Sequence, residues 1–286
     1  MTGDGEARTG WRGELAIDYW REDGRTLAHD RHVGPLRVLQ RLYPEGPGIC
    51  HHVLVHPPGG LVGGDTLDVS LALGPGSHAL LTTPGAARFY RSAGPVAAQQ
   101  VCARLAEGAR LEWLPLETIA YRGCRARNSL RFELAPEAEM MGWDLLALGL
   151  PAAGQDFEGA GEVWQHLEWP GVWLERGHLE AADRALIASP LGLDGCSVLA
   201  TLWWASGTPM STGRRDALLE AARECFAGHP ALASRAGVSA LDARLIVARV
   251  LSPRVEPAFA LWRSVRQRWR EIGWGYGGEP PRLWRT

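Results

Sequence analysis

The stretch His56-Pro57-Pro58-Gly59-Gly60-Leu61-Val62-Gly63-Gly64-Asp65 is the feature around which this chain is organised. Its four glycines surround two apolar residues, so backbone can pack where no side chain would fit, and its two prolines stop a helix from continuing through it. Leucine or valine then occupies every second position from Leu67 to Leu73. The stretch therefore predicts a tightly packed turn that leads into a half-buried strand.

A glycine-rich turn can also bind a ligand, but the neighbouring residues exclude the two commonest cases. No Lys-Ser or Lys-Thr follows, as a phosphate-binding loop requires, and the dinucleotide fingerprint G-x-G-x-x-G is absent. The entering His56 and the leaving Asp65 could carry chemistry. In a β-rich chain, however, a Gly-Gly-x-x-Gly-Gly turn more often serves close packing.

The composition is that of a folded globular protein, with 46% hydrophobic and 22% charged residues among 286. A formal net charge of −2 argues against sequence-independent nucleic-acid binding, which needs a basic surface. Every basic side chain other than histidine is arginine. A Schiff-base lysine, a lysine general base and a Walker lysine are therefore excluded.

The cysteines and the start of the chain favour a cytoplasmic protein. Five cysteines lie far apart without a C-x-x-C pair, which argues against a disulfide framework and a structural zinc site. Met1 to Arg12 is polar and unlike a signal peptide, and no apolar run approaches the roughly 18 residues of a membrane helix. We expect a flexible tail over residues 1–10, a single domain over residues 11–286 and no membrane partner.

Short apolar alternations broken by glycine and proline run from Trp11 to about residue 205, and their short connections favour antiparallel meanders. Two later segments have helical periodicity: Arg214 to Phe226, capped by Ser211 or Thr212, and a segment that starts at Pro257 and ends at Gly273. Between them Leu245 to Leu251 is a predicted buried strand. The predicted fold is mainly β, with two late α-helices.

Cys50, His51, His52, His56 and Asp65 form the densest group of possible metal ligands. In a strand, His52 and His56 face one side and His51 the other, so the three histidines converge only if a bulge intervenes. A tight transition-metal site needs about three converging ligands. A metal-dependent hydrolase that uses His52, His56 and Asp65 is therefore one alternative.

Other carboxylates do not form an obvious catalytic pair, and the interpretation favoured for them is a solvated surface. No G-x-S-x-G elbow is present. A second alternative is a carbohydrate- or protein-binding β module that uses the tryptophans between Trp164 and Trp173, although such aromatics more often belong to a sheet core. The carboxylates in question are Glu112, Glu117, Asp144, Glu158, Glu162 and Glu175.

Several separated motifs, from Trp11 to Thr286, resemble the urease accessory protein D family, called H in some bacteria. Two regions depart from its pattern: Gly149-Leu150-Pro151-Ala152 replaces a usual Gly-Arg-Pro-Ala, and Tyr121 to Cys124 is looser than typical. The motifs are the glycine turn itself, Gly34-Pro35-Leu36-Arg37-Val38, Tyr43-Pro44-Glu45-Gly46, Thr82-Thr83-Pro84-Gly85-Ala86, Phe89-Tyr90-Arg91-Ser92, Leu111-Glu112-Trp113-Leu114-Pro115-Leu116-Glu117 and Pro281-Arg282-Leu283-Trp284-Arg285-Thr286.

This resemblance implies a helical arrangement of β-strands and a role as a scaffold in urease maturation, not as an enzyme. Such proteins bind apo-urease and the F accessory protein, which recruits the GTPase G that carries nickel. The resemblance thus implies nickel in transit and no tightly bound cofactor.

A conduit must bind its ion weakly and at several stations, since a tight site would not release it. Imidazole suits nickel, and carboxylates provide weaker stations. We therefore expect an internal polar passage lined by Asp65, Glu117 and Asp144, with His56 and the hydroxyls of Thr82-Thr83.

The contact with F is predicted on apolar surface, and the helical stripe that contains Trp262 and Trp269 is one candidate. The alternative is that this stripe covers the β core.

Overall fold

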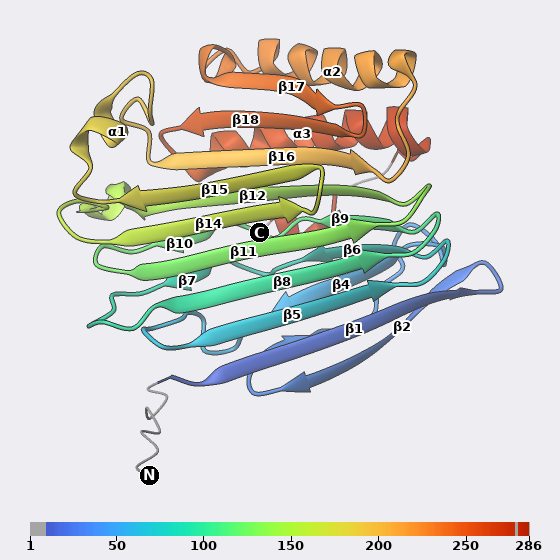
Figure 1. Cartoon of the computed structure of the whole chain (residues 1–286), viewed down its shortest axis with the longest axis horizontal. Helices are drawn as coiled ribbons and strands as arrows, with labels where there is room; N and C mark the ends of the chain where they lie inside the picture. Colours follow the sequence, from blue (N-terminus) through green and yellow to red (C-terminus); the bar gives the residue numbers. More distant parts are fainter. Residues whose placement is uncertain (1–9, 278–279, 286) are drawn as a thin grey trace.

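The computed structural model describes residues 10–277 and 280–285. It has three layers: two β-sheets face each other, and helices α2 (Thr212–Ala227) and α3 (Val255–Trp274) cover the outer face of the larger sheet (Figure 1). A five-residue helix, α1 (Arg184–Ala188), lies in a late connection. The predicted mainly β fold with two late helices is confirmed, and no helix in the described ranges is long and apolar enough to cross a membrane.

The strand order defines the two sheets. The smaller sheet runs β15 (Trp173–Glu180), β14 (Glu162–Trp169), β11 (Arg125–Leu134), β8 (Ala97–Leu105), β5 (Thr66–Leu73), β1 (Arg12–Glu22) and β2 (Arg25–Val33). The larger sheet runs β17 (Ala236–Asp242), β18 (Leu245–Ser252), β16 (Val198–Ser206), β12 (Glu139–Leu150), β9 (Arg110–Trp113), β6 (His78–Thr82), β4 (Cys50–Val55) and β3 (Arg37–Val38). Beside this path, β10 (Thr118–Ala120) pairs with β12 and β7 (Ala87–Phe89), and β13 (Gln155–Asp156) pairs with β12.

The chain winds between the sheets as a β-helix. Strands β5, β8, β11 and β14 are parallel neighbours in the smaller sheet, and between them the chain crosses to the larger sheet to form β6, β9 and β12. The predicted helical-β arrangement is confirmed. The prediction of antiparallel meanders is wrong for these strands, because a period-two pattern is the same in both pairings; antiparallel pairs occur in hairpins such as β1–β2 and β14–β15.

The glycine turn is packed as predicted. A Cβ added to Gly60 would lie 2.2 Å from the ring of Tyr90, and one added to Gly63 would lie 2.2 Å from Ser92 Oγ. Asp65 closes the turn, since its two carboxylate oxygens accept the backbone N–H groups of Trp11 and Val62 at 3.2 and 3.0 Å. The turn therefore fixes where β5 begins. Gly10, at the end of the predicted tail, already packs against Gly64, and residues 1–9 lie outside the described part.

Two buried clusters share the larger sheet. One lies between the sheets and the other lies between the larger sheet and helices α2 and α3. Strand β12 serves both, because Met140 points into the first cluster and Met141 into the second. Burying each large apolar side chain stabilises the fold by roughly 1.5–3 kcal/mol. The larger sheet is therefore buried on both faces along most of β12 and β16.

The two long helices differ from their predictions only in the residues at which they begin and end. Ser211 Oγ caps α2 by accepting the Arg214 N–H at 3.3 Å, and α3 ends at the left-handed Gly275 instead of at Gly273. Gly273 is a packing position, because the Trp204 ring lies 2.1 Å from where its Cβ would be. The strand predicted at Leu245 is β18.

Candidate functional site

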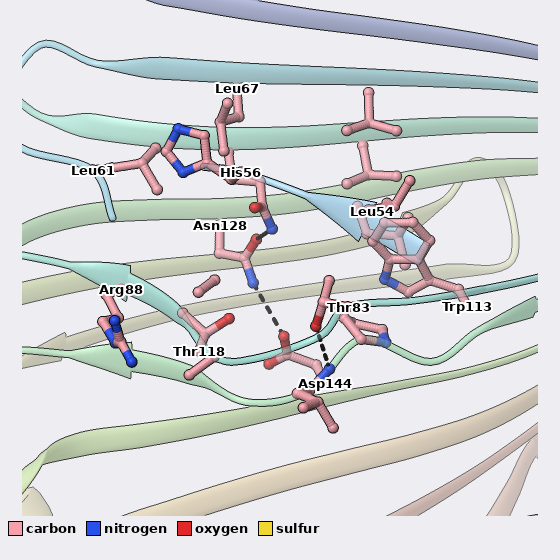
Figure 2. A pocket seen from close by; sticks show the side chains of 18 of the residues that line it. Leu54, His56, Leu61, Leu67, Thr83, Arg88, Trp113, Thr118, Asn128 and Asp144 are labelled. Atoms are coloured by element: carbon pink, nitrogen blue, oxygen red, sulfur yellow. Dashed lines mark hydrogen bonds between the residues drawn. The ribbon is translucent and has the colours of Figure 1, made fainter. Parts of the chain in front are cut away.

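A cavity of about 270 Å³ lies between the two sheets, beside the glycine turn (Figure 2). Apolar side chains such as Leu54, Leu67 and Trp203 form much of its wall, and a group of polar residues interrupts them. The volume is large enough for several water molecules. Its polar lining residues are His56, Thr83, Arg88, Gln99, Thr118, Asn128, Ser129, Asp144, Gln165 and His166.

Asp144 projects from β12 into this cavity and is held by two side-chain amides from the smaller sheet. Asn128 Nδ2 donates to its Oδ1 at 3.1 Å, the bond drawn in Figure 2, and Gln165 Nε2 donates to its Oδ2 at 2.5 Å. Gln99, Asn128 and Gln165 occupy aligned positions on β8, β11 and β14. Gln99 in turn donates to Asn128 Oδ1 at 3.2 Å. The parallel register thus builds an amide ladder that reaches Asp144 across the cavity.

Burial raises the pKa of Asp144 to about 6, although the hydrogen bond from Gln165 opposes the shift and the charge of Glu175 adds to it. The carboxylate is therefore mostly ionised at pH 7. Within residues 10–277 and 280–285, no arginine or histidine forms an ion pair with it. An ionised carboxylate between two sheets without a countercharge is a place where a cation is favoured.

His56 lies on the cavity wall, with its ring centroid 5.0 Å from that of Trp11. Burial lowers its pKa, although the charge of Asp65 opposes this, so the imidazole is neutral at pH 7. Its Nε2 is buried and has no hydrogen-bond partner in the described part of the chain. A neutral imidazole with a free nitrogen is able to bind a transition metal.

The two threonines of the predicted passage, one at the end of β6 and the other just after it, point to opposite sides of the larger sheet. Thr83 lines the cavity, where its hydroxyl donates to the Gly85 carbonyl at 3.0 Å and accepts the Leu116 N–H at 2.9 Å. Thr82 instead accepts the Trp284 indole N–H at 2.8 Å on the helix side of the sheet. That bond is also what joins the motif at the end of the chain to β6.

Asp65 and Glu117 lie outside the cavity lining. Asp65 is buried within the glycine turn, where its oxygens are occupied by backbone donors. Glu117 is half-buried between two lining residues, Leu116 and Thr118, and its backbone oxygen accepts the Ala87 N–H at 2.9 Å. The structure therefore brings His56, Thr83 and Asp144 to one cavity and leaves Asp65, Thr82 and Glu117 outside it.

The histidines of β4 are occupied by other partners. His52 Nδ1 lies 2.7 Å from the Tyr19 hydroxyl, and burial lowers the pKa of His52 to about 4. On the opposite face of β4, His51 Nε2 lies 2.9 Å from Glu45 Oε1. Across the described ranges, no three His, Cys, Asp or Glu side chains are placed to hold a metal ion together. The hydrolase alternative has no site there.

A buried ion cluster on the helix side of the larger sheet was missed by the sequence analysis. Glu112, interpreted as a surface carboxylate, is fully buried and contacts Arg266 and Arg270 of α3. His78 lies 3.2 Å from the same carboxylate, and Glu45 lies 2.8 Å from Arg270. The helix sequence contained evidence for this cluster, because Arg266 and Arg270 follow the spacing of the apolar stripe and are therefore expected on the buried face.

The tryptophan candidates for partner binding are largely interior. Trp262 and Trp269 are fully buried, and the Trp269 indole donates to the Leu218 carbonyl at 2.8 Å. Both pack between α3 and the sheet, as in the alternative in which the stripe covers the β core. In the second region Trp169 and Trp173 are buried. Trp164 stacks on His178, with ring centroids 4.8 Å apart, and does not continue into an aromatic strip.

Comparison with known proteins matches the chain to one family along nearly its whole length. The family described as UreD urease accessory protein matches residues 12–285. Proteins named urease accessory protein UreD from Leptothrix cholodnii and Variovorax paradoxus are 63% and 55% identical, each alignment covering 96% of this chain and 99% of the relative. These names describe accessory proteins, which confirms the prediction that the chain is not an enzyme. The chain belongs to the UreD urease accessory protein family.

Proposed function

We propose that this chain is a scaffold in urease maturation that binds apo-urease and the F accessory protein in the cytoplasm. In this proposal, nickel supplied by the GTPase G is cargo that passes through the cavity between the sheets, and no cofactor is held tightly. Family membership supports the role in urease maturation. The cavity supports the passage of an ion.

The main support for the proposed nickel route is the Asp144 carboxylate, which has no ion-pair partner in the described ranges. Each of its oxygens already accepts one amide N–H, so part of its capacity to bind a metal is occupied. A nickel ion at Asp144 would therefore gain only weak coordination from the protein and would retain water ligands. Weak coordination suits a station from which the ion must leave.

The other cavity residues suit the same role. His56 offers a neutral imidazole nitrogen, which is a favourable ligand for nickel. Thr83 adds a hydroxyl to the lining of the same cavity. Asp65 and Glu117 have a different place in this proposal: Asp65 holds the glycine turn that shapes the cavity, and Glu117 stands beside two lining residues.

The test is co-expression of Asp144→Ala with the urease genes, followed by measurement of nickel per urease active site. We expect nickel loading to fall severalfold while the complex with urease and F is recovered in normal amount. The matched control is Glu133→Ala, which removes a carboxylate that is 45% exposed and lies outside the cavity lining. Wild-type nickel loading by Asp144→Ala in an intact complex would remove Asp144 from the route.

Asp65→Ala and Glu117→Ala extend the same experiment. Because Asp65 bonds two backbone N–H groups, its loss should lower the yield of folded protein, and nickel loading must be normalised to recovered complex. Glu117→Ala should leave folding intact, since its side chain is half-buried and, in the described ranges, its bond to Ala87 is made by the backbone oxygen. Normal loading by both variants would restrict the stations to the residues that line the cavity.

A further inference from the structure

Strand β2 leaves a backbone edge of the smaller sheet open. Thr26 donates its N–H to the Pro47 carbonyl and accepts the Tyr43 hydroxyl, so its backbone groups point away from β1. Along an antiparallel strand, the backbone N–H and C=O groups of successive residues point alternately toward and away from the neighbouring strand. The β1–β2 register has no bulge, so the backbone groups of Asp30 and His32 point outward, as those of Thr26 do. No residue in the described ranges bonds these outward groups. Such an edge is able to pair with another strand.

A groove and exposed apolar side chains lie along this edge. The groove has a volume of about 520 Å³ and is bounded by β2 and the segment from Val38 to Tyr43. Eight large apolar side chains are prominently exposed in the described part of the chain, and three of them lie here: Val33, Leu39 and Leu42 are 63%, 50% and 47% exposed. Leu39 lines the groove itself, whereas Val33 ends β2 and Leu42 lies in the bounding segment. Exposed apolar residues beside a groove are typical of interaction surfaces.

The same region is positively charged in a chain whose formal net charge is −2. Residues 25–41 contain four arginines and one acidic residue, Asp30. Arg31 and Arg41 are well exposed, and each has one acidic neighbour: Arg31 lies 2.8 Å from Asp18 and Arg41 lies 3.8 Å from Asp30. Arg25 stacks on the Tyr43 ring at 4.2 Å beside the groove. A partner strand with acidic side chains would complement this charge.

We propose that the β2 edge binds an extended acidic segment of a partner protein by strand addition. Main-chain hydrogen bonds to Asp30 and His32 would give affinity, and the arginines would select acidic residues. A second copy of this chain fits poorly, because edge-to-edge pairing would bring two cationic edges together. The proposal does not depend on the nickel route.

The test uses the full chain and three fluorescent decapeptides in an anisotropy titration. The first alternates glutamate with valine, the second replaces glutamate by lysine, and the third carries the first sequence with alternate backbone nitrogens methylated. We expect saturable binding of the first peptide, at least tenfold weaker binding of the second and loss of binding by the third. Equal binding of all three would overturn the proposal, because neither charge nor backbone pairing would then matter.

Two sets of variants test whether the peptide binds at the β2 edge. Removing two exposed charges with Arg31→Gln/Arg41→Gln should weaken binding by up to about fivefold for each arginine. Arg104→Gln/Arg223→Gln is the matched control, because both of its arginines are exposed and lie on other elements, and it should bind like the wild type. Unchanged binding by the first double variant would overturn the proposal.

His32→Pro removes an outward-pointing N–H, a change that edge strands tolerate. This variant should bind the glutamate peptide about fivefold to tenfold more weakly than the wild type does. Hydrogen exchange on the wild-type chain gives an independent readout, with slower exchange of the Asp30 and His32 amides when the peptide is bound. Three results would contradict the proposal. The peptide could slow amide exchange only at other residues, or it could disrupt a dimer of this chain. The third result is that a single-stranded oligonucleotide binds more tightly than the glutamate peptide.

Discussion

Glu112 Oε2 lies 2.7 Å from Arg266 Nη2, and the two side chains are 0% and 2% exposed. The other oxygen of this carboxylate lies 3.1 Å from Arg270 Nε, so one acidic group on β9 joins two arginines on α3. Burial alone would raise the pKa of Glu112, but the charges of Arg266 and Arg270 outweigh it and hold the pKa well below its usual range. This buried carboxylate therefore links β9 to α3 at two points.

Replacing the buried carboxylate should be strongly destabilising. Glu112→Gln leaves Arg266 and Arg270 buried without their counterion, and we expect the free energy of unfolding to fall by about 3–5 kcal/mol. Urea unfolding measures this. The control Glu133→Gln affects a carboxylate that is 45% exposed and contacts Arg104 and Arg131, and should change stability by less than about 1 kcal/mol. Similar losses in the two variants would contradict the role assigned to Glu112.

Acid should remove the contribution of Glu112. Because its pKa is lowered in the folded protein, its stabilising effect is complete above about pH 4.3, the ordinary glutamate value, and is lost as the pH falls further. The difference in unfolding free energy between wild type and Glu112→Gln should therefore shrink below about pH 4.3. Urea unfolding of both proteins at a series of acidic pH values measures it; a difference that grows as the pH falls would be inconsistent with a lowered pKa.

Asp144 should give the opposite pH dependence. Its pKa rises from an ordinary value near 3.9 to about 6, so the folded protein holds an extra proton between these values and the wild type loses stability as the pH rises through them. Asp144→Asn removes this loss, which amounts to at most about 3 kcal/mol. Urea unfolding at several pH values should show that the unfolding free energy of the variant rises relative to that of the wild type up to about pH 6. A constant difference across this range would mean that burial does not shift the pKa.

The amide ladder should control whether Asp144 is charged. Gln165→Leu removes the donor 2.5 Å from Asp144 Oδ2, so the pKa should rise further and fewer molecules should carry the negative charge at pH 7. If nickel passes this point, its loading into urease should decrease at pH 7 and recover in part at higher pH. Gln100→Leu is the matched control, because Gln100 neighbours Gln99 on β8 but is exposed on the outer face. Unaltered loading by Gln165→Leu would argue against a role for the ladder.

The glycine turn should not tolerate a methyl group at Gly63, whereas Gly85, which lies outside the turn, should. A Cβ at Gly63 would lie 2.2 Å from Ser92 Oγ and 2.8 Å from the Pro95 carbonyl oxygen, so Gly63→Ala should lower stability by about 1–3 kcal/mol. Gly85 has no atom within 4 Å of its Cβ position and provides the control. Thermal unfolding distinguishes them; equal melting temperatures for Gly63→Ala and Gly85→Ala would show that the turn adapts without cost.

Most of the elements follow from local pattern. Alternation at period two predicts strands such as β5 and β18, and the apolar stripe predicts α3, because each pattern reports which side of one element is buried. The turn at residues 56–65 follows from its glycines for the same local reason. Parallel pairing of β5 with β8 does not follow, because the pattern within a strand carries no information about the direction of its neighbour.

By itself, the sequence determined the strands, the two long helices, the packed turn and, through its motifs, the family. Only the tertiary structure decided which polar residues share a cavity. The larger sheet is buried on both faces, so alternation does not show that Thr83 and Asp144 face the other sheet while Thr82 and Glu112 face the helices. The distinction depends on contacts between residues far apart in the chain, such as Asn128 with Asp144 and Glu112 with Arg266.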